Sequence, residues 1–494
     1  MSESVAPLPV DPFAPAVDVA AAVRAGSVSA VEVTEAALAR IAEVDPLLGA
    51  FTVVLRERAL DEARAVDRRS SGEPELPLAG VPLAVKDHVW LAGAPATNGS
   101  RILADFVPDE DCVAVRRLTG AGAVIVGKTN NPEFCYRGDT DSPLWGLTRN
   151  PFDRERTPGG SSGGSGVAVA TGMAALAVGT DGGGSIRGPS AFCGTVGHKP
   201  TYGVVPTRPG FRGWPTLSVH GPMGRSVADV AAMLAVMAGP HPADPATVPF
   251  DTATLASVGA GRDDLSGLRV AVSADFGFAA VDRDVRAGFD EAVKVLEGLG
   301  CALAEAHPPP NEDAVALWLL IAACEGYASE GPLLDREAEM TPYSARTIRS
   351  GEAISAAEYL DAQWRRERMS RSWGAFLEDY DVIVSPGQQV LPFSVGLSDN
   401  EGDDPSLWGM DSIANLTGQP VTSVPSGVAA GGLPVGVQFM GRRFADVQVL
   451  RTAAIFERHV ARPVPAAPFG PLEQTASTLM KPTSGARPEN LDSE

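Results

Sequence analysis

Apolar runs alternate with amphipathic stretches along most of this chain. Short apolar runs typical of buried strands cover residues 80–86, 123–126, 174–179, 269–273, 301–304, 381–385 and 433–438. Stretches with helical spacing lie before, between and after them, at 17–24, 30–43, 111–120, 163–173, 284–299 and 445–459. This alternation predicts an α/β fold: a single large domain in which helices flank a mixed, mostly parallel β-sheet.

The 494 residues fit one large domain with an insertion as well as they fit up to three smaller domains. We expect residues 1–75 to form an N-terminal helical segment packed on the core, and 76–462 to form the main domain. Helices with polar faces dominate 307–375, which suggests a helical insertion over one side. Residues 463–494 are rich in Pro, Ser, Thr and Ala and predict a C-terminal tail with little core of its own.

The charge and cysteine content narrow the function classes. Lys and Arg number 40 against 61 Asp and Glu, and the net charge of −21 argues against nucleic acid or an anionic membrane as partner. The chain contains no run of 18 apolar residues and no visible secretory signal. Five cysteines without C-x-x-C spacing predict reduced thiols in a cytoplasmic protein, with no metal site.

The densest chemical signal is the glycine- and serine-rich stretch 158–195. A flexible linker is disfavoured because its glycines flank an apolar stretch that predicts packed helix and strand. A phosphate-binding loop is disfavoured because neither GK[ST] nor a complete dinucleotide fingerprint is present. Residues 160–164 fit the G-x-S-x-G nucleophile motif, but no histidine downstream has the distinctive setting that this motif needs. A serine nucleophile with a different base fits better.

Lys86 is a candidate for that base. It is one of only five lysines and ends an apolar strand, where α/β folds place their chemistry. A lysine can activate a serine; the alternative is a strand-end lysine paired with the adjacent Asp87. Ser185 follows three glycines whose backbone N–H groups could converge as an oxyanion hole; the alternative is a tight turn with an incidental serine.

These motifs together resemble the amidase signature family. The resemblance spans about residues 15–460 and includes GKTNNPEF (127–134), GLTRNPFD (146–153) and HGPMGRSVADVA (220–231). It implies an amidase signature catalytic domain, with Ser185 as the acylated nucleophile, Ser161 as the bridging serine on a cis peptide bond, and Lys86 as the terminal base.

The resemblance also implies roles around this triad. The oxyanion-hole amides would be those of Gly182, Gly183, Gly184 and Ser185. Ser162, Asp181 and Arg187 would be supporting residues. Substrate would contact Cys135, Tyr136 and Ser161.

The expected enzyme is an amidase that cleaves a small aliphatic or aryl amide to carboxylate and amine through an acyl-serine intermediate. Ester or carbamate (urethane) cleavage is compatible with the same chemistry. No cofactor is expected, and the chain should be a monomer or homodimer. The alternative is the A subunit of a glutamine-dependent tRNA amidotransferase, which needs partner subunits and tRNA. Residues 386–389 read PGQQ, which departs from the Thr-Pro-Thr type run of the family. The resemblance therefore does not predict the pocket lining at this point.

Overall fold

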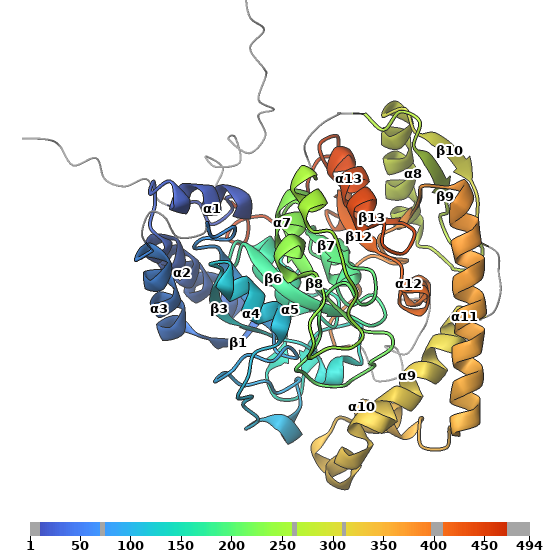
Figure 1. Ribbon diagram of the computed structural model, residues 1–494, viewed down its shortest axis with the longest axis horizontal. Helices are drawn as coiled ribbons and strands as arrows, with labels where there is room; N and C mark the ends of the chain where they lie inside the picture. Colours follow the sequence, from blue (N-terminus) through green and yellow to red (C-terminus); the bar gives the residue numbers. More distant parts are fainter. Residues whose placement is uncertain (1–9, 70–74, 259–263, 309–312, 397–408, 472–494) are drawn as a thin grey trace, which may run out of the picture.

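The computed structural model describes residues 10–69, 75–258, 264–308, 313–396 and 409–471. An eleven-stranded sheet runs through the molecule in the order β1-β3-β2-β6-β8-β7-β12-β13-β11-β9-β10 (Figure 1). Its strands are β1 (Phe51–Val54), β2 (Pro82–Lys86), β3 (Val124–Thr129), β6 (Leu176–Asp181), β7 (Val196–Lys199), β8 (Val219–Gly224), β9 (Arg269–Val272), β10 (Ala302–Glu305), β11 (Val382–Pro386), β12 (Val421–Val428) and β13 (Pro434–Met440). The short strands β4 (Asp141–Ser142) and β5 (Gly146–Leu147) pair separately.

The sheet is mixed, as predicted, but it is not mostly parallel. Among the described strand pairs of this sheet, β2–β3, β2–β6, β9–β10 and β9–β11 are parallel, and the other six are antiparallel. The expectation of a mostly parallel sheet is therefore corrected. Antiparallel pairs are more numerous than expected because β7, β8 and β12 lie in the middle of the sheet in antiparallel pairs. The apolar pattern did not reveal these three strands.

Helices cover both faces of the sheet. They are α1 (Ala16–Arg24), α2 (Ala30–Leu48), α3 (Arg56–Asp67), α4 (Val113–Gly120), α5 (Gly163–Ala170), α6 (Arg187–Phe192), α7 (Val227–Met237), α8 (Arg283–Gly298), α9 (Ala314–Glu330), α10 (Pro342–Arg349), α11 (Ala356–Asp379), α12 (Ser412–Thr417) and α13 (Asp446–Glu457). Successive strand residues face opposite sides. Leu83 of β2 accordingly packs in a cluster with α4 and α7, whereas Ala84 packs in one with α2 and α5.

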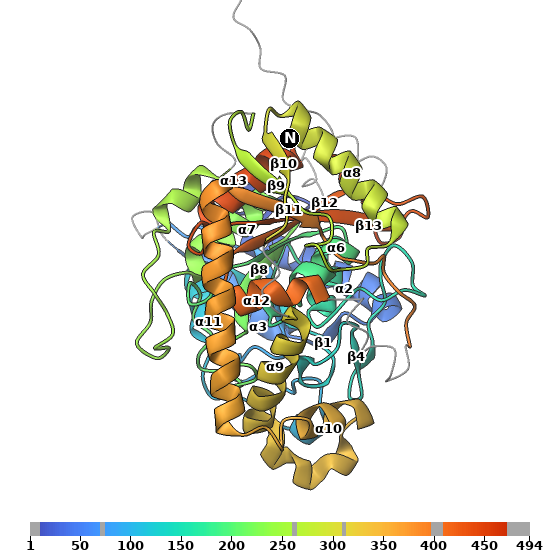
Figure 2. The ribbon, with the colours of Figure 1, turned by 90° about the vertical axis from the view of Figure 1, so that its right-hand side faces the viewer.

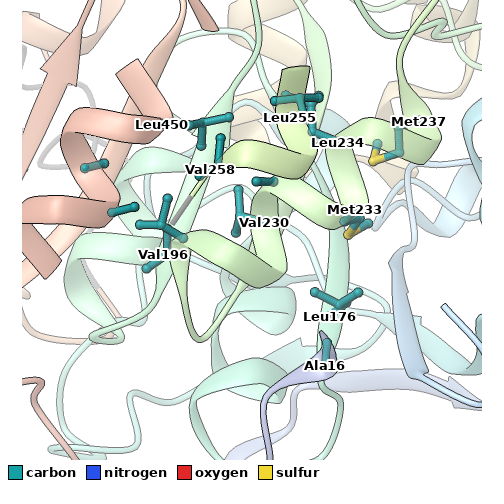
Figure 3. Close-up of a cluster of buried hydrophobic side chains, with 14 of the residues drawn as sticks. Ala16, Leu176, Val196, Val230, Met233, Leu234, Met237, Leu255, Val258 and Leu450 are labelled. Atoms are coloured by element: carbon teal, nitrogen blue, oxygen red, sulfur yellow. The ribbon is translucent and has the colours of Figure 1, made fainter. Parts of the chain in front are cut away.

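The first of these clusters forms the larger part of the core. Figure 3 shows its centre, where Val230, Met233, Leu234 and Met237 of α7 lie among side chains from α1, β6, β7, α13 and the 3₁₀ helix Ala253–Ser257. Burial of such side chains is worth roughly 1.5–3 kcal/mol each. This packing fixes the central strands, whose ends carry the candidate site.

The first 75 residues contribute more than helices. Ser29 begins α2 with a capping box: its Oγ accepts from the backbone N–H of Glu32, and the Glu32 carboxylate accepts from the backbone N–H of Ser29. Besides α1–α3, this part supplies β1, which pairs antiparallel with β3 at the sheet edge.

The stretch 307–375 is helical in its described part. It contains α9, the 3₁₀ segment Gly331–Glu339, α10 and most of α11, and these project together from the sheet layer (Figure 2). Of the expected tail, 463–471 is described and 472–494 lies outside the described residues. In the part of the chain with coordinates, no helix is both long and apolar enough to cross a bilayer.

Candidate active site

The candidate site lies where three neighbouring parallel strands end. β2 pairs in parallel with β3 on one side and with β6 on the other. Their carboxyl ends therefore share one edge of the sheet. This edge gathers Lys86, the last residue of β2, with Thr180 and Asp181 at the end of β6.

Lys86 is fully buried and holds two hydroxyl groups. Its Nζ donates to Ser161 Oγ at 2.6 Å and to Thr180 Oγ1 at 2.7 Å. Burial lowers the pKa of Lys86, because an ammonium group is poorly solvated there; Cys135, Asp181 and Asp87 oppose this shift. A buried lysine with a lowered pKa is well suited to accept a proton from a hydroxyl group.

Ser161 sits just before α5, in the glycine-rich turn. The peptide bond between Gly160 and Ser161 is cis, and both Ser161 and Ser162 are buried. Ser162 joins this turn to β6, since its Oγ lies 3.2 Å from both N and O of Thr180. The backbone N–H of Ser162 donates to the carbonyl oxygen of Ser185 at 3.2 Å. A direct hydrogen bond thus links the turn that carries Ser161 and Ser162 to the turn that carries Ser185.

Asp181 and Arg187 hold the loop that carries Ser185. Arg187, which is completely buried, donates from Nη2 and Nε to the two carboxylate oxygens of Asp181, each at 3.0 Å. Asp181 also accepts from the backbone N–H of Gly184 at 2.9 Å and of Ile186 at 3.1 Å. Burial alone would raise the pKa of Asp181, but the charge and hydrogen bonds of Arg187 hold it well below its usual range. The carboxylate stays ionised and braces the loop on both sides of Ser185.

This bracing changes the expectation for one oxyanion-hole amide. The N–H of Gly184 points at Asp181, so it is engaged within the loop. Gly184 adopts φ +113°, and a Cβ there would approach Asp411, so the position requires glycine. Trp318 of α9 donates from Nε1 to the carbonyl oxygen of Gly182 at 2.8 Å and fixes the other end of the glycine run.

A cavity of about 260 Å³ opens next to Ser185. The glycine run forms one side, and α9, α10 and the turn that contains Cys135 and Tyr136 form others. Its aromatic wall consists of Tyr136, Phe192, Trp214, Trp318, Tyr343 and Phe393. Within this wall Tyr136 stacks on Trp214 with ring centres 5.4 Å apart, and Trp214 meets Trp318 edge-on at 5.1 Å.

Polar groups stand behind this wall and at its rim. The Tyr136 hydroxyl donates to Glu330 Oε2 at 2.9 Å, and burial raises the pKa of Glu330 to about 8. Arg137 pairs with Asp139 at 2.8 Å. Gln388 belongs to the run 386–389, which departs from the family pattern. It lines the cavity, and its side-chain amide donates to Asp411.

The structure brings together the residues that the sequence proposed. Lys86, Ser161, Ser162, Asp181, Ser185 and Arg187 form one connected region, and Gly183, Gly184, Cys135 and Tyr136 line its cavity. Sequence reasoning missed Thr180, Asp411, Asn415 and Trp318. Only Thr180 had an available signal, because it directly follows the apolar run 174–179, at a predicted strand end.

The chain is similar to known proteins along most of its length. The A subunit of the glutamyl-tRNA(Gln) amidotransferase from Symbiobacterium thermophilum is 40% identical over 475 residues, covering 89% of this chain and 96% of that protein. An acylamidase of Rhodococcus erythropolis is 38% identical over 456 residues, covering 90% and 94% respectively. The crystal structure of a bacterial aryl acylamidase of the amidase signature family superposes with a TM-score of 0.84 at 29% identity, covering 91% of this chain and 97% of that one.

A family model described as Amidase matches residues 32–450, nearly the whole of the sheet and its flanking helices. With that match and these relatives, the chain belongs to the amidase signature family.

Proposed function

We propose that the chain cleaves a small carboxylic acid amide through an acyl-serine intermediate on Ser185. The observation that carries this proposal is the 2.6 Å hydrogen bond between buried Lys86 and Ser161, beside a cavity that exposes Ser185. Neutral Lys86 accepts the Ser161 proton while Ser161 takes the proton of Ser185 Oγ. Ser185 Oγ then bonds to the amide carbonyl carbon, and the carbonyl oxygen becomes an oxyanion.

Backbone amides of the glycine run stabilise this oxyanion. Gly182, Gly183 and Ser185 are the proposed donors, whereas Gly184 is withdrawn from that set because its N–H serves Asp181. The proton returns from Lys86 through Ser161 to the amine, which leaves as the C–N bond breaks. Water then cleaves the acyl ester and regenerates Ser185.

The cavity supports a small amide with an aryl or compact aliphatic group. Its volume of about 260 Å³ falls just under the ~300–1,000 Å³ of sites for drug-sized ligands, and six aromatic residues line it. Esters and carbamates present a similar carbonyl to the same nucleophile. We place the enzyme in the cytoplasm, without a cofactor, as a monomer or homodimer.

The second candidate is the glutamine-cleaving component of a tRNA-dependent amidotransferase. Its support is the 40% identity to the A subunit of such an enzyme along almost the full chain, which makes it the reading that the relatives favour. Such a protein would release ammonia from glutamine and work with partner subunits. The net charge of −21 is unfavourable for contact between this chain itself and tRNA.

The purified chain without partners distinguishes the two candidates. It is given 4-nitroacetanilide and, separately, L-glutamine, with nitroaniline and ammonia as the products measured and Ser185→Ala as the control. The first candidate predicts anilide hydrolysis that the control lacks. If the chain hydrolysed glutamine but not the anilide, the first candidate would be overturned in favour of the second. A folded chain that cleaved neither substrate would contradict a free-standing amidase.

A further inference from the structure

Two tryptophans of the cavity wall lie directly against the glycine run. A Cβ at Gly182 would come within 2.6 Å of Trp214 Cε3. A Cβ at Gly183 would come within 2.8 Å of Trp318 Cζ2. Both indole rings also line the cavity beside Ser185. Their positions therefore define the shape of the cavity next to the proposed nucleophile.

Trp214 lies in a turn, 213–217, that belongs to no helix or strand. The position of its ring therefore depends on what holds this turn. Ser329 of α9 donates from Oγ to the carbonyl oxygen of Gly213 at 2.7 Å, which fixes one end. The remaining contacts of the turn with α9 and α11 converge on Thr216.

Thr216 is held between two oppositely charged side chains of the helical stretch 307–375. Arg366 of α11 donates from Nη1 to Thr216 Oγ1 at 2.8 Å and from Nη2 to Thr216 O at 2.7 Å. The hydroxyl and the backbone N–H of Thr216 both donate to the carboxylate of Glu325 in α9. Tyr359 of α11 donates to the same carboxylate at 2.7 Å. Every hydrogen-bonding group of Thr216 is thus engaged by α9 or α11.

The neighbouring rings of the wall are also anchored on α9. Trp318 belongs to that helix, and the hydroxyl of Tyr136 donates to Glu330 at its end, at 2.9 Å. Tyr136 stacks on Trp214, and Trp214 meets Trp318 edge-on. The helical stretch therefore holds three contacting rings in one defined arrangement beside the glycine run.

We propose that Glu325 and Arg366 are positioning residues that set a preference for aryl amides: through Thr216 they hold Trp214 where its ring packs against an aromatic group of the substrate. The inference rests on the proposed function above and gives the stretch 307–375 a role in substrate selection. Aromatic rings in offset or edge-on contact are stabilised beyond the area that they bury, provided that their geometry is maintained. A saturated ring of similar size buries a similar area without this gain.

The test measures binding in the full chain with Ser185→Ala, so that no ligand is cleaved. Acetanilide and N-cyclohexylacetamide, which differ only in the aromaticity of the ring, are titrated by calorimetry. Acetanilide should bind about tenfold more tightly. Adding Thr216→Val removes the hydroxyl between Glu325 and Arg366, and should reduce this preference to about threefold or less. Thr216→Ser keeps the hydroxyl and should retain the preference.

Two further variants keep the test decisive. Arg366→Lys keeps the positive charge but loses the two-pronged contact with Thr216, so it should also lose the preference, and it replaces Thr216→Val if that variant does not fold. Thr119→Val, in α4, removes a half-buried hydroxyl that donates to Arg116 O and should change nothing.

Three results would overturn the proposal. They are no measurable binding of either ligand, no aryl preference in the starting chain, and an unchanged preference in Thr216→Val or Arg366→Lys. The last result is the one that a purely structural role of the contacts with Thr216 predicts. A chain that is acylated on Ser185 but shows no aryl preference would keep the proposed function and lose only this inference.

Discussion

The strongest prediction concerns Asp181, whose side chain holds the loop that carries Ser185. Its two carboxylate oxygens accept from Arg187 at 3.0 Å each and from the N–H groups of Gly184 and Ile186 at 2.9 and 3.1 Å. Asp181→Asn removes the negative charge. It also replaces one of the two accepting oxygens with an NH₂ group, which cannot accept from the donors on that side. Arg187 then stays buried with less compensation. Removing one partner of a buried ion pair costs about 3–5 kcal/mol, which is the expected loss in the free energy of unfolding.

The chain offers a matched control at Asp446. This carboxylate is also fully buried and accepts from Thr201 N at 2.8 Å and Oγ1 at 2.7 Å, with His198 Nε2 at 3.2 Å. Asp446→Asn should therefore destabilise the protein by about 1.5–3 kcal/mol without touching the glycine run. Only Asp181→Asn should also lower kcat/KM, by about 100-fold, because a displaced Ser185 loop loses its alignment with the carbonyl carbon.

Urea unfolding and steady-state kinetics of the wild type and both variants measure these effects. The pKa of Asp181 is depressed in the folded protein, so its stabilisation is complete above about pH 5 and lost as the pH falls below its unfolded value of ~3.9. The stability difference between wild type and Asp181→Asn should shrink over that acidic range. If Asp446→Asn lowered kcat/KM as much as Asp181→Asn, the loop-bracing role of Asp181 would be refuted.

Two further predictions concern Lys86 and its partners. Because catalysis needs neutral Lys86, kcat/KM should rise with pH to an optimum on the alkaline side; a profile that stays flat down to pH 5 would contradict Lys86 as the base. Thr180→Val removes the hydroxyl that lies 2.7 Å from Lys86 and should lower kcat/KM up to about tenfold, as expected for one hydrogen bond of about 0.5–1.5 kcal/mol, while Thr180→Ser should retain activity. Equal activity of the valine and serine variants would exclude a role for that contact.

The sequence predicted the long apolar and amphipathic segments better than the strands whose apolar pattern is interrupted. Long apolar or strongly amphipathic segments such as β2, β6, α2 and α8 were expected close to their observed bounds, because burial of their apolar faces decides their structure. β7 (VGHK) and β8 (VHGPMG) lack that pattern, since glycine, histidine and proline interrupt them. Pairing with neighbouring strands, which no local pattern encodes, makes them strands, and this is why the share of antiparallel pairs was underestimated.

The residues of the candidate site were likewise predicted from the sequence only in part. Its residues from 86 to 187 follow from strand ends, a glycine run and a family resemblance. Asp411 and Asn415 contact Arg187 across 224 and 228 positions of sequence, a distance over which a lone chain gives no signal.

The central claim is that Ser185 forms an ester with the acyl group of its substrate, with Lys86 as the base. The most direct measurement is mass spectrometry of the intact chain and its peptides after rapid acid quench with an excess of an activated aryl ester. One acyl group per chain is expected, located on Ser185, absent from Ser185→Ala and strongly reduced in Lys86→Ala. An acyl group on Ser161 or Cys135 in the wild type, or undiminished acylation of Ser185→Ala, would contradict this claim.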